Sequence, residues 1–397
     1  MFLTIFLRVL LLPLYLINLC IPKNKTIWIF GSWKGETYND NSKYLYEYVY
    51  KKTDSPIRAI WLTKKKSIIE QLKKEGKECY YFYSLPGMCY SIIAGVAVVS
   101  RTWFDLPFTT LLFPQRTLYV QLWHGTPLKK LDKLLRGSLF SQILKIIFRV
   151  YSGRDYDLVI SATEKNVFIY QDIFSISKKN IKILGQPRND ALFSQKKEIM
   201  VPARKKKKII LYMPTWRSYP YNYFDKKFGF DLKKLESFLY KENCLLVVKL
   251  HFHDQEKYKK QFSSKYIIFI NDIDDIYPYL SSVDILLTDY SSIFYDFLLV
   301  KKPIIFLPFD IARYTKDVGE FYHGYEKVTP GYKAKNWDEV IGEIKNIFKG
   351  KDRYKRKRGE INDMFNPFKD GKNSERVYQE IMTSLQARQA RKSTRKA

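Results

Sequence analysis

The chain has 397 residues and a mass of 47.4 kDa, and its 69 Lys and Arg against 40 Asp and Glu give a formal net charge of +29. At 46% hydrophobic and 16% aromatic residues, it is far too apolar for a disordered basic tail. Its four scattered cysteines exclude a disulfide-stapled secreted module and favour a reducing compartment. The length predicts about two to three domains, and the charge predicts an anionic partner: nucleic acid, a membrane or a phosphorylated substrate.

The first segment, residues 1–23, is apolar and amphipathic. Its uninterrupted apolar run, residues 9–16, falls short of the roughly 20 residues that a spanning helix needs, and Pro13 interrupts it. Only Arg8 precedes this run and no small-residue cleavage site follows it, which argues against a secretory signal peptide. A narrow polar stripe on an apolar helix is typical of a helix at a membrane interface, and a buried first helix is the alternative.

Short apolar, β-rich runs then alternate with longer amphipathic stretches. The runs are nearly continuous in apolar residues, as expected for parallel strands covered on both faces, and helical spacing marks residues 138–150 and 232–241. In chain order the predicted strands are residues 26–30, 59–62, 96–100, 118–122, 158–161, 181–184, 209–213, 245–250, 267–270, 285–288 and 304–307. This alternation predicts an α/β fold with parallel sheets.

A charged break at residues 194–208 divides the pattern into two halves, because apolar periodicity lapses there. We predict two Rossmann-type parallel-sheet domains that face a central cleft, at residues 24–195 and 206–385, followed by a basic tail at 386–397. The sequence contains no G-x-G-x-x-G and no Walker motif, which argues against a dinucleotide-dependent oxidoreductase and a P-loop enzyme.

Polar residues directly after strands are the candidate site residues, because ligands of parallel sheets bind beyond the carboxyl ends of the strands. His124 follows the fourth predicted strand in YVQLWHGTPLKK, and Gly125 and Thr126 open a turn behind it. A histidine there can take a proton from an alcohol at neutral pH, and a turn histidine without a chemical role is the alternative. Lys129 and Lys130 come next and would attract an anion.

Further candidates follow the strands of the second half. Lys249 and His251 stand where the strand LLVVKL ends, and the H-x-H pair with His253 is weak evidence for a metal, so we predict no metal site. Arg217, in the run MPTWR, could grip a phosphate with two hydrogen bonds.

The run TDYSS ends one strand and opens a helix. Thr288, Ser291 and Ser292 supply hydroxyls there, and the helix start supplies backbone N–H groups, which together form a phosphate cradle. Plain capping of the helix by Asp289 or Ser291 is the alternative. The strand ends together offer His, Lys, Arg, Thr and Ser, a set that suits a diphosphate ligand.

At these residues the sequence resembles the CDP-glycerol glycerophosphotransferase family, the wall teichoic acid primases and polymerases. The likeness covers nearly all of the chain, and its specific parts are WHGTPLK and TDYSS. The matching segments are GSWKGETYNDNSKYLYEYV (31–49), QLWHGTPLKKL (121–131), GQPRND (185–190), YMPTWR (212–217), KLH (249–251), DILLTDYSSIFYDF (284–297) and DGKNSER (370–376). The resemblance implies a GT-B-like pair of domains, with the nucleotide held mainly by the C-terminal one.

The resemblance also implies transfer of glycerol phosphate from CDP-glycerol to an acceptor hydroxyl, with release of CMP. The catalytic histidine pair of the family maps onto His124 and His251. Phe252 stands where the family usually has proline, and Gly324 lies in a stretch where an acidic residue is common, which leaves the details of substrate choice open. The residues assigned to CDP-glycerol binding are Gly125, Thr126, Arg217, Lys249, Thr288, Asp289, Ser291 and Ser292.

Residues and resemblance lead to one hypothesis, in which His124 is the general base and the groups of the second half stabilise the diphosphate and departing CMP. It requires no protein-bound cofactor, and Mg²⁺ carried by the diphosphate is compatible with it. The alternatives are a ribitolphosphotransferase that uses CDP-ribitol and a GT-B glycosyltransferase that uses a nucleotide sugar. Primase and polymerase activities both remain open.

The positive charge then indicates where the enzyme works. We expect the acceptor to be a lipid-linked (polyprenyl diphosphate) glycan, a poly(glycerol phosphate) chain or a capsule repeat. A peripheral protein at the cytoplasmic face of the bacterial membrane would reach it, held there by its basic ends and amphipathic first segment. Nucleic acid is not expected as a partner, because the basic residues are spread along the whole chain and no nucleic-acid motif is present.

Overall fold

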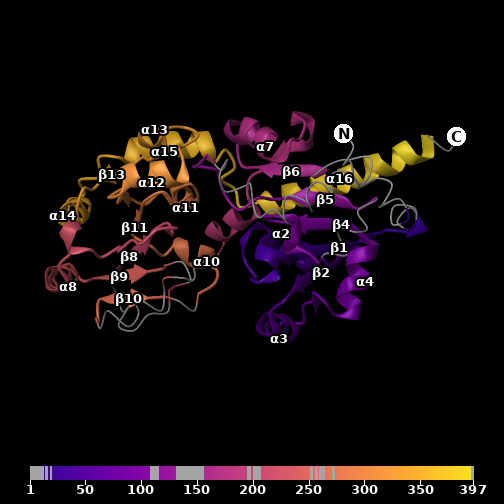
Figure 1. The fold of residues 1–397 in the computed structure, drawn as a ribbon, viewed down its shortest axis with the longest axis horizontal. Helices are drawn as coiled ribbons and strands as arrows, with labels where there is room; N and C mark the ends of the chain where they lie inside the picture. The colour runs from indigo at the N-terminus through magenta and orange to yellow at the C-terminus, as the bar shows by residue number, and fades with distance from the viewer. Residues whose placement is uncertain are drawn as a thin grey trace. The chain divides into compact units, whose positions relative to one another are not determined.

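The computed structural model describes residues 13, 17, 20–107, 116–130, 156–194, 198–199, 207–250, 254, 258, 264–270 and 273–394. The chain divides into two compact units. Unit 1 comprises residues 1–124, 135–193 and 370–397, and unit 2 comprises residues 125–134 and 194–369. Each unit is built on one parallel sheet against which helices pack (Figure 1).

Unit 1 contains, in its described part, a seven-stranded sheet in the order β3-β2-β1-β4-β5-β6-β7. Its strands are β1 (Asn24–Gly31), β2 (Arg58–Thr63), β3 (Cys79–Tyr81), β4 (Ala94–Val99), β5 (Leu118–Gln121), β6 (Leu158–Ser161) and β7 (Ile181–Ile183). Its α-helices are α2 (Asp40–Lys51), α3 (Lys66–Lys74), α4 (Leu85–Ile93), α7 (Val167–Phe174) and α16 (Asn373–Thr394). Short 3-10 turns are η1 (Trp33–Gly35), η2 (Trp103–Asp105), η3 (Glu164–Asn166), η4 (Lys178–Asn180) and η5 (Pro187–Leu192).

Unit 2 contains, among the residues described, a six-stranded sheet in the order β10-β9-β8-β11-β12-β13. Its strands are β8 (Lys208–Met213), β9 (Cys244–Val248), β10 (Ile267–Phe269), β11 (Ile285–Thr288), β12 (Ile304–Phe306) and β13 (Tyr332–Lys333). Its α-helices are α8 (Leu232–Lys241), α10 (Tyr277–Leu280), α11 (Ile293–Phe297), α12 (Ile311–Val318), α13 (Tyr325–Val328), α14 (Trp337–Phe348) and α15 (Lys355–Phe365). The 3-10 turns are η6 (Lys226–Phe228) and η7 (Leu298–Val300).

Both sheets begin at a central strand, wind outwards to one edge and then return to fill the other side. This is the strand order of doubly wound, dinucleotide-binding sheets. The order reverses between β1 and β4 in unit 1 and between β8 and β11 in unit 2. Ligands of such sheets bind beyond the carboxyl ends of the strands at this switch point, so the loops after these four strands are the places that position a site.

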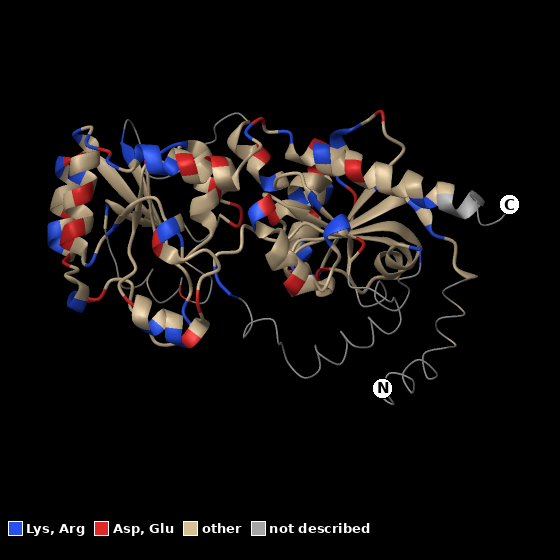
Figure 2. Ribbon diagram, turned by 90° about the horizontal axis from the view of Figure 1, so that it is seen from above, with Lys and Arg blue, Asp and Glu red and all other residues tan. Residues whose placement is uncertain are grey.

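Burial explains why these runs form strands. All six residues of β4 are buried, as are all five of β9, because helices and loops cover both faces of each sheet. Charged residues gather on the helices and loops instead (Figure 2). Helix α8 begins where Asp231 accepts the backbone N–H of Lys234 at 3.0 Å, which satisfies one of the free donors of its first turn. No described helix is long and apolar enough to cross a bilayer.

The structure contains every predicted strand, with ends shifted by at most two residues, and the predicted helix 232–241 is α8. The predicted pair of parallel-sheet domains is therefore confirmed. Strands β3 and β13 were not predicted from the sequence; they are edge strands of only three and two residues. The predicted helix 138–150 and most of the first segment, 1–23, lie outside the described residues.

The C-terminal boundary differs from the prediction. Residues 370–385, which we placed in the second domain, belong to unit 1, and residues 386–394 of the expected tail continue α16 as helix. The physical reason is packing: Val377 and Ile381 of α16 are completely buried in the same core as Trp28 and Phe30 of β1.

Candidate active site

The histidine of WHGTPLKK lies at the carboxyl end of β5, where the chain leaves the sheet of unit 1. Trp123, just before it, has a φ of 58°, a left-handed conformation that costs a bulky residue on the order of 1 kcal/mol or more. The ring centroid of His124 lies 4.2 Å from that of Trp123 and 6.0 Å from that of Trp33 in η1. Arg101, after β4, stacks on the Trp33 ring, 4.5 Å from its centroid. Three strand ends thus meet around the imidazole.

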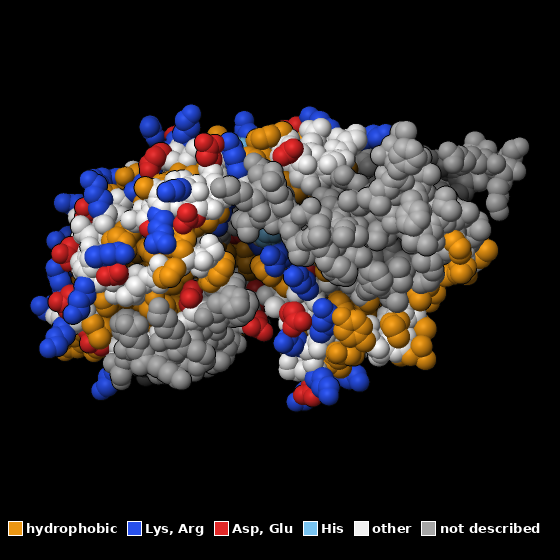
Figure 3. All heavy atoms as spheres, in the orientation of Figure 1, with side chains coloured by type: hydrophobic (Ala, Val, Ile, Leu, Met, Phe, Trp, Pro, Cys, Tyr) orange, Lys and Arg blue, Asp and Glu red, His pale blue; other side chains and the backbone are white. Residues whose placement is uncertain are grey.

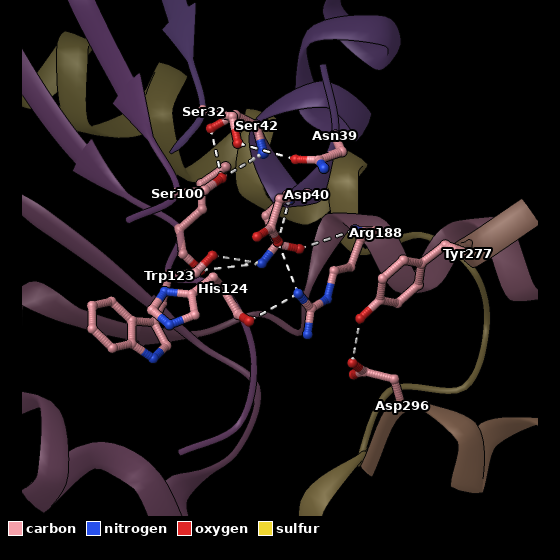
Figure 4. A network of polar contacts seen from close by, with 12 residues as sticks. Ser32, Asn39, Asp40, Ser42, Ser100, Trp123, His124, Arg188, Tyr277 and Asp296 are labelled. Atoms are coloured by element: carbon pink, nitrogen blue, oxygen red, sulfur yellow. Dashed lines mark hydrogen bonds and ion pairs between the residues drawn. The ribbon is translucent and has the colours of Figure 1, made fainter. Parts of the chain in front are cut away.

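Two more segments of the family resemblance reach this turn. Asn41 at the start of α2 donates to the backbone carbonyl of Trp123. Arg188 in η5 donates to the backbone carbonyl of His124 (Figure 4). Asp190, also in η5, accepts two backbone N–H groups from the first residues of α16 at 2.8 Å each. One contact network in unit 1 therefore joins the motif segments 31–49, 121–131, 185–190 and 370–376.

A buried carboxylate ties the loops at the switch point of unit 1. Asp105 of η2 accepts four backbone N–H groups, at 2.7–3.2 Å, from Lys34, Ser100, Arg101 and Thr102. Burial raises the pKa of Asp105 to about 6, and these hydrogen bonds only partly oppose that shift. One carboxylate therefore links the loops after β1 and β4.

Arg217 occupies the corresponding region of unit 2, four residues beyond β8. Its Nη2 donates to Asp289 Oδ2 at 2.8 Å and to Asp310 Oδ1 at 2.9 Å, and its Nε donates to Asp310 Oδ2 at 2.8 Å. Its Nη1 donates to the carbonyl oxygen of Thr215 at 2.5 Å. The three charged side chains are only 1%, 3% and 7% exposed. Two carboxylates within unit 2 therefore neutralise this guanidinium.

Tyrosine rings enclose this ion triad of Arg217, Asp289 and Asp310. The Cζ atom of Arg217 lies 4.7–4.9 Å from the ring centroids of Tyr221, Tyr290 and Tyr314. Burial alone would raise the pKa of Asp310, but the hydrogen bonds and positive charge of Arg217 hold it below its usual range. The triad links the loops after β8, β11 and β12 through buried hydrogen bonds.

The TDYSS run lies at the end of β11, as predicted from the sequence. The hydroxyl of Thr288 donates to the last carbonyl of β8 at 2.8 Å, and Asp289 Oδ1 accepts the backbone N–H of Thr215 at 2.8 Å. Both side chains thus hold the two loops together. Ser291 and Ser292 are half-buried at the start of α11, and Ser292 makes no side-chain capping bond there.

The remaining predicted residues lie on two other segments of unit 2. Lys249 follows β9, its Nζ donates to the carbonyl of Ile273, and burial lowers its pKa. His251 lies outside the described residues. Gly125, with a φ of 133°, and the buried Thr126 begin the segment that follows the histidine.

This segment also brings a cation to the ion triad. Lys129 forms an antiparallel bridge with Phe321, and its Nζ lies 5.3 Å from the ring centroid of Tyr314. Burial lowers the pKa of Lys129 to about 8, and the charge of Asp289 opposes that shift. Lys129 therefore carries a positive charge at pH 7 beside the loops after β8 and β11.

Asp310, Asn41 and Arg188 hold the site, but no sequence pattern singled them out as site residues. Asp310 follows β12 by four residues, so the search for polar groups beyond strand ends could have found it. Asn41 and Arg188 lie inside two of the quoted motif segments, but neither follows a strand directly. Only the fold shows that they reach the turn of His124.

Each switch point thus offers different chemistry. Unit 1 presents an imidazole that can accept a proton, and unit 2 presents hydroxyls, backbone N–H groups and lysines that can bind an anion. Nowhere in the described ranges do three or more His, Cys, Asp or Glu side chains gather as a metal site would require.

Known proteins share this chain's sequence and fold. The model of the CDP-glycerol:poly(glycerophosphate) glycerophosphotransferase family matches residues 13–383. The teichoic acid glycerol-phosphate transferase of Staphylococcus aureus is 28% identical over 386 residues, covering 90% of this chain and 93% of that protein. The teichoic acid poly(glycerol phosphate) polymerase of Bacillus spizizenii is 32% identical over 349 residues, covering 82% and 84%. The solved structure of the wall teichoic acid polymerase TagF has the same fold, with a TM-score of 0.71 at 23% identity over 92% of this chain and 90% of that one.

Proposed function

Since this chain belongs to the CDP-glycerol:poly(glycerophosphate) glycerophosphotransferase family, we propose that it transfers glycerol phosphate from CDP-glycerol to a hydroxyl of a teichoic acid acceptor and releases CMP. The match of the family across residues 13–383 carries this proposal. The position of His124 at a strand end, among the loops of a switch point, supports it.

In the proposed reaction the acceptor hydroxyl oxygen attacks the phosphorus that bears glycerol. The bond from that phosphorus to the bridging oxygen breaks, and CMP leaves with the electron pair. His124 takes the hydroxyl proton, a task that suits an imidazole near neutral pH. For His251, the second catalytic role comes from the family resemblance alone.

We assign the donor contacts in unit 2 according to the burial and charge pairing of each side chain. Ser291, Ser292 and Lys249 are half-buried and supply hydroxyl and ammonium groups for the diphosphate. Arg217 and Asp289 are nearly fully buried and paired with one another, so we propose that they position the loops instead of touching the phosphates. This role differs from the phosphate grip expected of Arg217.

The other donor contacts expected from the sequence remain part of the proposal. Gly125 and Thr126 follow the proposed base directly and would line the donor site through their backbone. Thr288 would act through its bond to the end of β8. Mg²⁺, a hard cation that commonly binds substrate phosphates, would enter with the diphosphate, and turnover with and without a chelator tests its contribution.

We further propose that the enzyme works as a peripheral protein at the cytoplasmic face of the membrane, where a lipid-linked acceptor lies. Helix α4 supports this, because its sequence LPGMCYSII contains no charge and its Leu85 is 73% exposed. Tyr83, just before it, is 57% exposed, and Lys64 lies 6.0 Å from the Tyr83 ring centroid. Hydrophobic side chains gather over α4, with lysines of α3 nearby (Figure 3). Exposed apolar groups flanked by tyrosine and lysine suit an anionic lipid surface.

A vesicle assay tests this surface. Leu85→Glu should weaken co-sedimentation of the full chain with anionic vesicles by at least threefold. Phe168→Glu is the matched control, since Phe168 is also exposed, at 55%, but lies on α7. Equal binding by both variants and the wild type would contradict a role for α4 in membrane binding.

One experiment tests the reaction. The enzyme is incubated with CDP-glycerol, CDP-ribitol or nucleotide sugars together with synthetic lipid-linked acceptors, and the products are weighed by mass spectrometry. We expect CMP release and an acceptor heavier by one glycerol phosphate, both lost in a folded His124→Ala variant. A ribitol phosphate product would reassign the donor, and a nucleoside diphosphate with a glycosylated acceptor would make the enzyme a glycosyltransferase.

A further inference from the structure

The backbone on both sides of the proposed base is held by two buried side chains that no step of the reaction uses. Asn41 Nδ2 donates to the carbonyl oxygen of Trp123 at 2.8 Å, and Arg188 Nη1 donates to that of His124 at 2.9 Å. The backbone N–H of Arg188 donates to Asn41 Oδ1 at 3.1 Å. The two clamping residues therefore also fix each other.

Asp40 connects this clamp to the wall of the imidazole. Its Oδ1 accepts a hydrogen bond from Arg188 Nη1 at 2.8 Å, and its Oδ2 accepts one from Trp33 Nε1 at 3.2 Å. The Trp33 ring is one of the two tryptophan rings that contact His124. Figure 4 shows the Arg188 guanidinium bonded to both the Asp40 carboxylate and the backbone carbonyl of His124. The Asp40 carboxylate thus holds both the guanidinium that donates to the His124 carbonyl and the Trp33 ring.

The buried ion pair of Arg188 and Asp40 fixes the geometry of the turn more than it stabilises the fold. The side chains of Arg188 and Asp40 are each 6% exposed, and an ion pair so buried repays its desolvation poorly compared with apolar residues of the same volume. Meanwhile Trp123 is kept in a left-handed conformation that an unrestrained bulky residue avoids. A costly ion pair therefore maintains a strained turn, and that turn carries His124.

We propose that Asn41, Arg188 and Asp40 are positioning residues for His124, holding the turn after β5 so that the imidazole points at the acceptor hydroxyl. This inference rests on the proposed function. Proton transfer needs the imidazole within about 3 Å of the hydroxyl, and a displacement of about 1 Å can cost on the order of 100-fold in rate. The clamp should therefore act on kcat and leave donor binding nearly unchanged.

Conservative variants test the clamp without removing the core. Asn41→Asp keeps the Oδ1 acceptor and loses the Nδ2 donor. Arg188→Lys keeps the charge, but its nitrogen lies one bond closer to Cα than Nη1, which displaces it from the two oxygens that Nη1 bonds. Each should lower kcat about 100-fold while KM for CDP-glycerol stays within about threefold. Asp190→Asn is the matched control, because Asp190 lies in the same η5 turn but caps α16. It should lower the melting temperature with kcat within about threefold of wild type.

Nuclear magnetic resonance provides a readout that is independent of turnover. The chain has four histidines, so ¹⁵N-histidine labelling gives few imidazole signals, and His124→Ala assigns the one that matters. We expect Asn41→Asp and Arg188→Lys to shift or broaden the His124 signals and Asp190→Asn to leave them in place. Unchanged His124 signals, or an unchanged kcat, in both clamp variants would overturn the proposal. Failure of the wild type to release CMP would refute the reaction instead, because the imidazole signals still report on the clamp.

Discussion

Replacing Arg217 by lysine distinguishes a residue that braces the loops from one that grips the donor. Lysine keeps the charge but loses the planar fork that reaches Asp289 and Asp310 together. The site is almost fully buried, so carboxylate oxygens left without donors cost about 1–3 kcal/mol each, and complete loss of the pairing costs about 3–5 kcal/mol. We therefore expect a loss of about 2–4 kcal/mol, or roughly 5–15 °C in the melting temperature of unit 2.

Calorimetric melting, together with titration of CDP-glycerol well below the transition, measures both effects. Arg358→Lys is the control. Arg358 is a buried arginine of unit 2 that lies in α15 and pairs with Asp352, so it is not part of the loops at the switch point. Both variants should melt earlier, and only Arg217→Lys should also weaken donor binding. An unchanged melting temperature combined with a tenfold loss of donor affinity in Arg217→Lys would refute the bracing role and restore direct phosphate contact.

Three further substitutions probe the switch points. Burial raises the pKa of Asp105 from 3.8 to about 6, so protonation of Asp105 stabilises the fold below about pH 4, and this contribution is lost as the pH rises through 6. The free energy of unfolding of the wild type, measured in urea relative to Asp105→Asn, should therefore fall between pH 4 and 6. A constant difference between the two proteins would contradict the raised pKa. A Cβ at Gly31 would lie 1.9 Å from the carbonyl oxygen of Asp105, so Gly31→Ala should cost about 3 kcal/mol of stability, measured by thermal melting. Gly342 has open space around it inside α14, so Gly342→Ala should melt at or slightly above the wild-type temperature. With a pKa of about 8, Lys129 loses its charge between pH 7 and 9. KM for CDP-glycerol should therefore rise over that range in the wild type and rise much less in Lys129→Arg. An equal rise in both proteins would exclude a contact between Lys129 and CDP-glycerol.

The strands were predictable because each central strand is buried on both faces. The run ILLT of β11 carries four buried residues in a row and ends at a polar residue, so its bounds could be predicted without error. The run CYY of β3 is partly exposed at the sheet edge and shows neither continuous burial nor alternation. Edge strands depend on the neighbour that pairs with them, which local sequence does not describe.

Helix α16 shows what periodicity cannot predict. Val377, Ile381 and Leu385 follow each other at four-residue spacing, which indicates a helix with one buried face. The same spacing would suit the core of either unit. Helix α16 packs in unit 1, where the ring centroid of Tyr378 lies 5.6 Å from that of Trp28. This contact joins residues 350 positions apart in the sequence, so no local pattern could predict it.

Arg217 shows the same limit for the site. The rule of polar groups beyond strand ends places it beyond β8, where the structure has it, and its residue type suggested a phosphate ligand. Its actual neighbour Asp310 lies 93 residues further on, and no local pattern pairs the two. The sequence therefore predicts which edge of the sheet carries the polar residues. It does not predict which charged side chains there are already paired with one another.

The two units hold the loops at their switch points in the same way, with a buried ion pair. In each, an arginine near the switch point is paired with buried carboxylates, Arg188 with Asp40 in unit 1 and Arg217 with Asp289 and Asp310 in unit 2. These guanidiniums stiffen loops and add little net positive charge to the strand ends. A transferase that releases CMP gains nothing from fixed cations that bind donor and product equally well, because uniform binding does not speed the chemical step and slows release. Hydroxyls, an imidazole and lysines with lowered pKa values are weaker anion ligands than an unpaired arginine. Rigid loops that carry such ligands can favour the transition state while letting CMP depart.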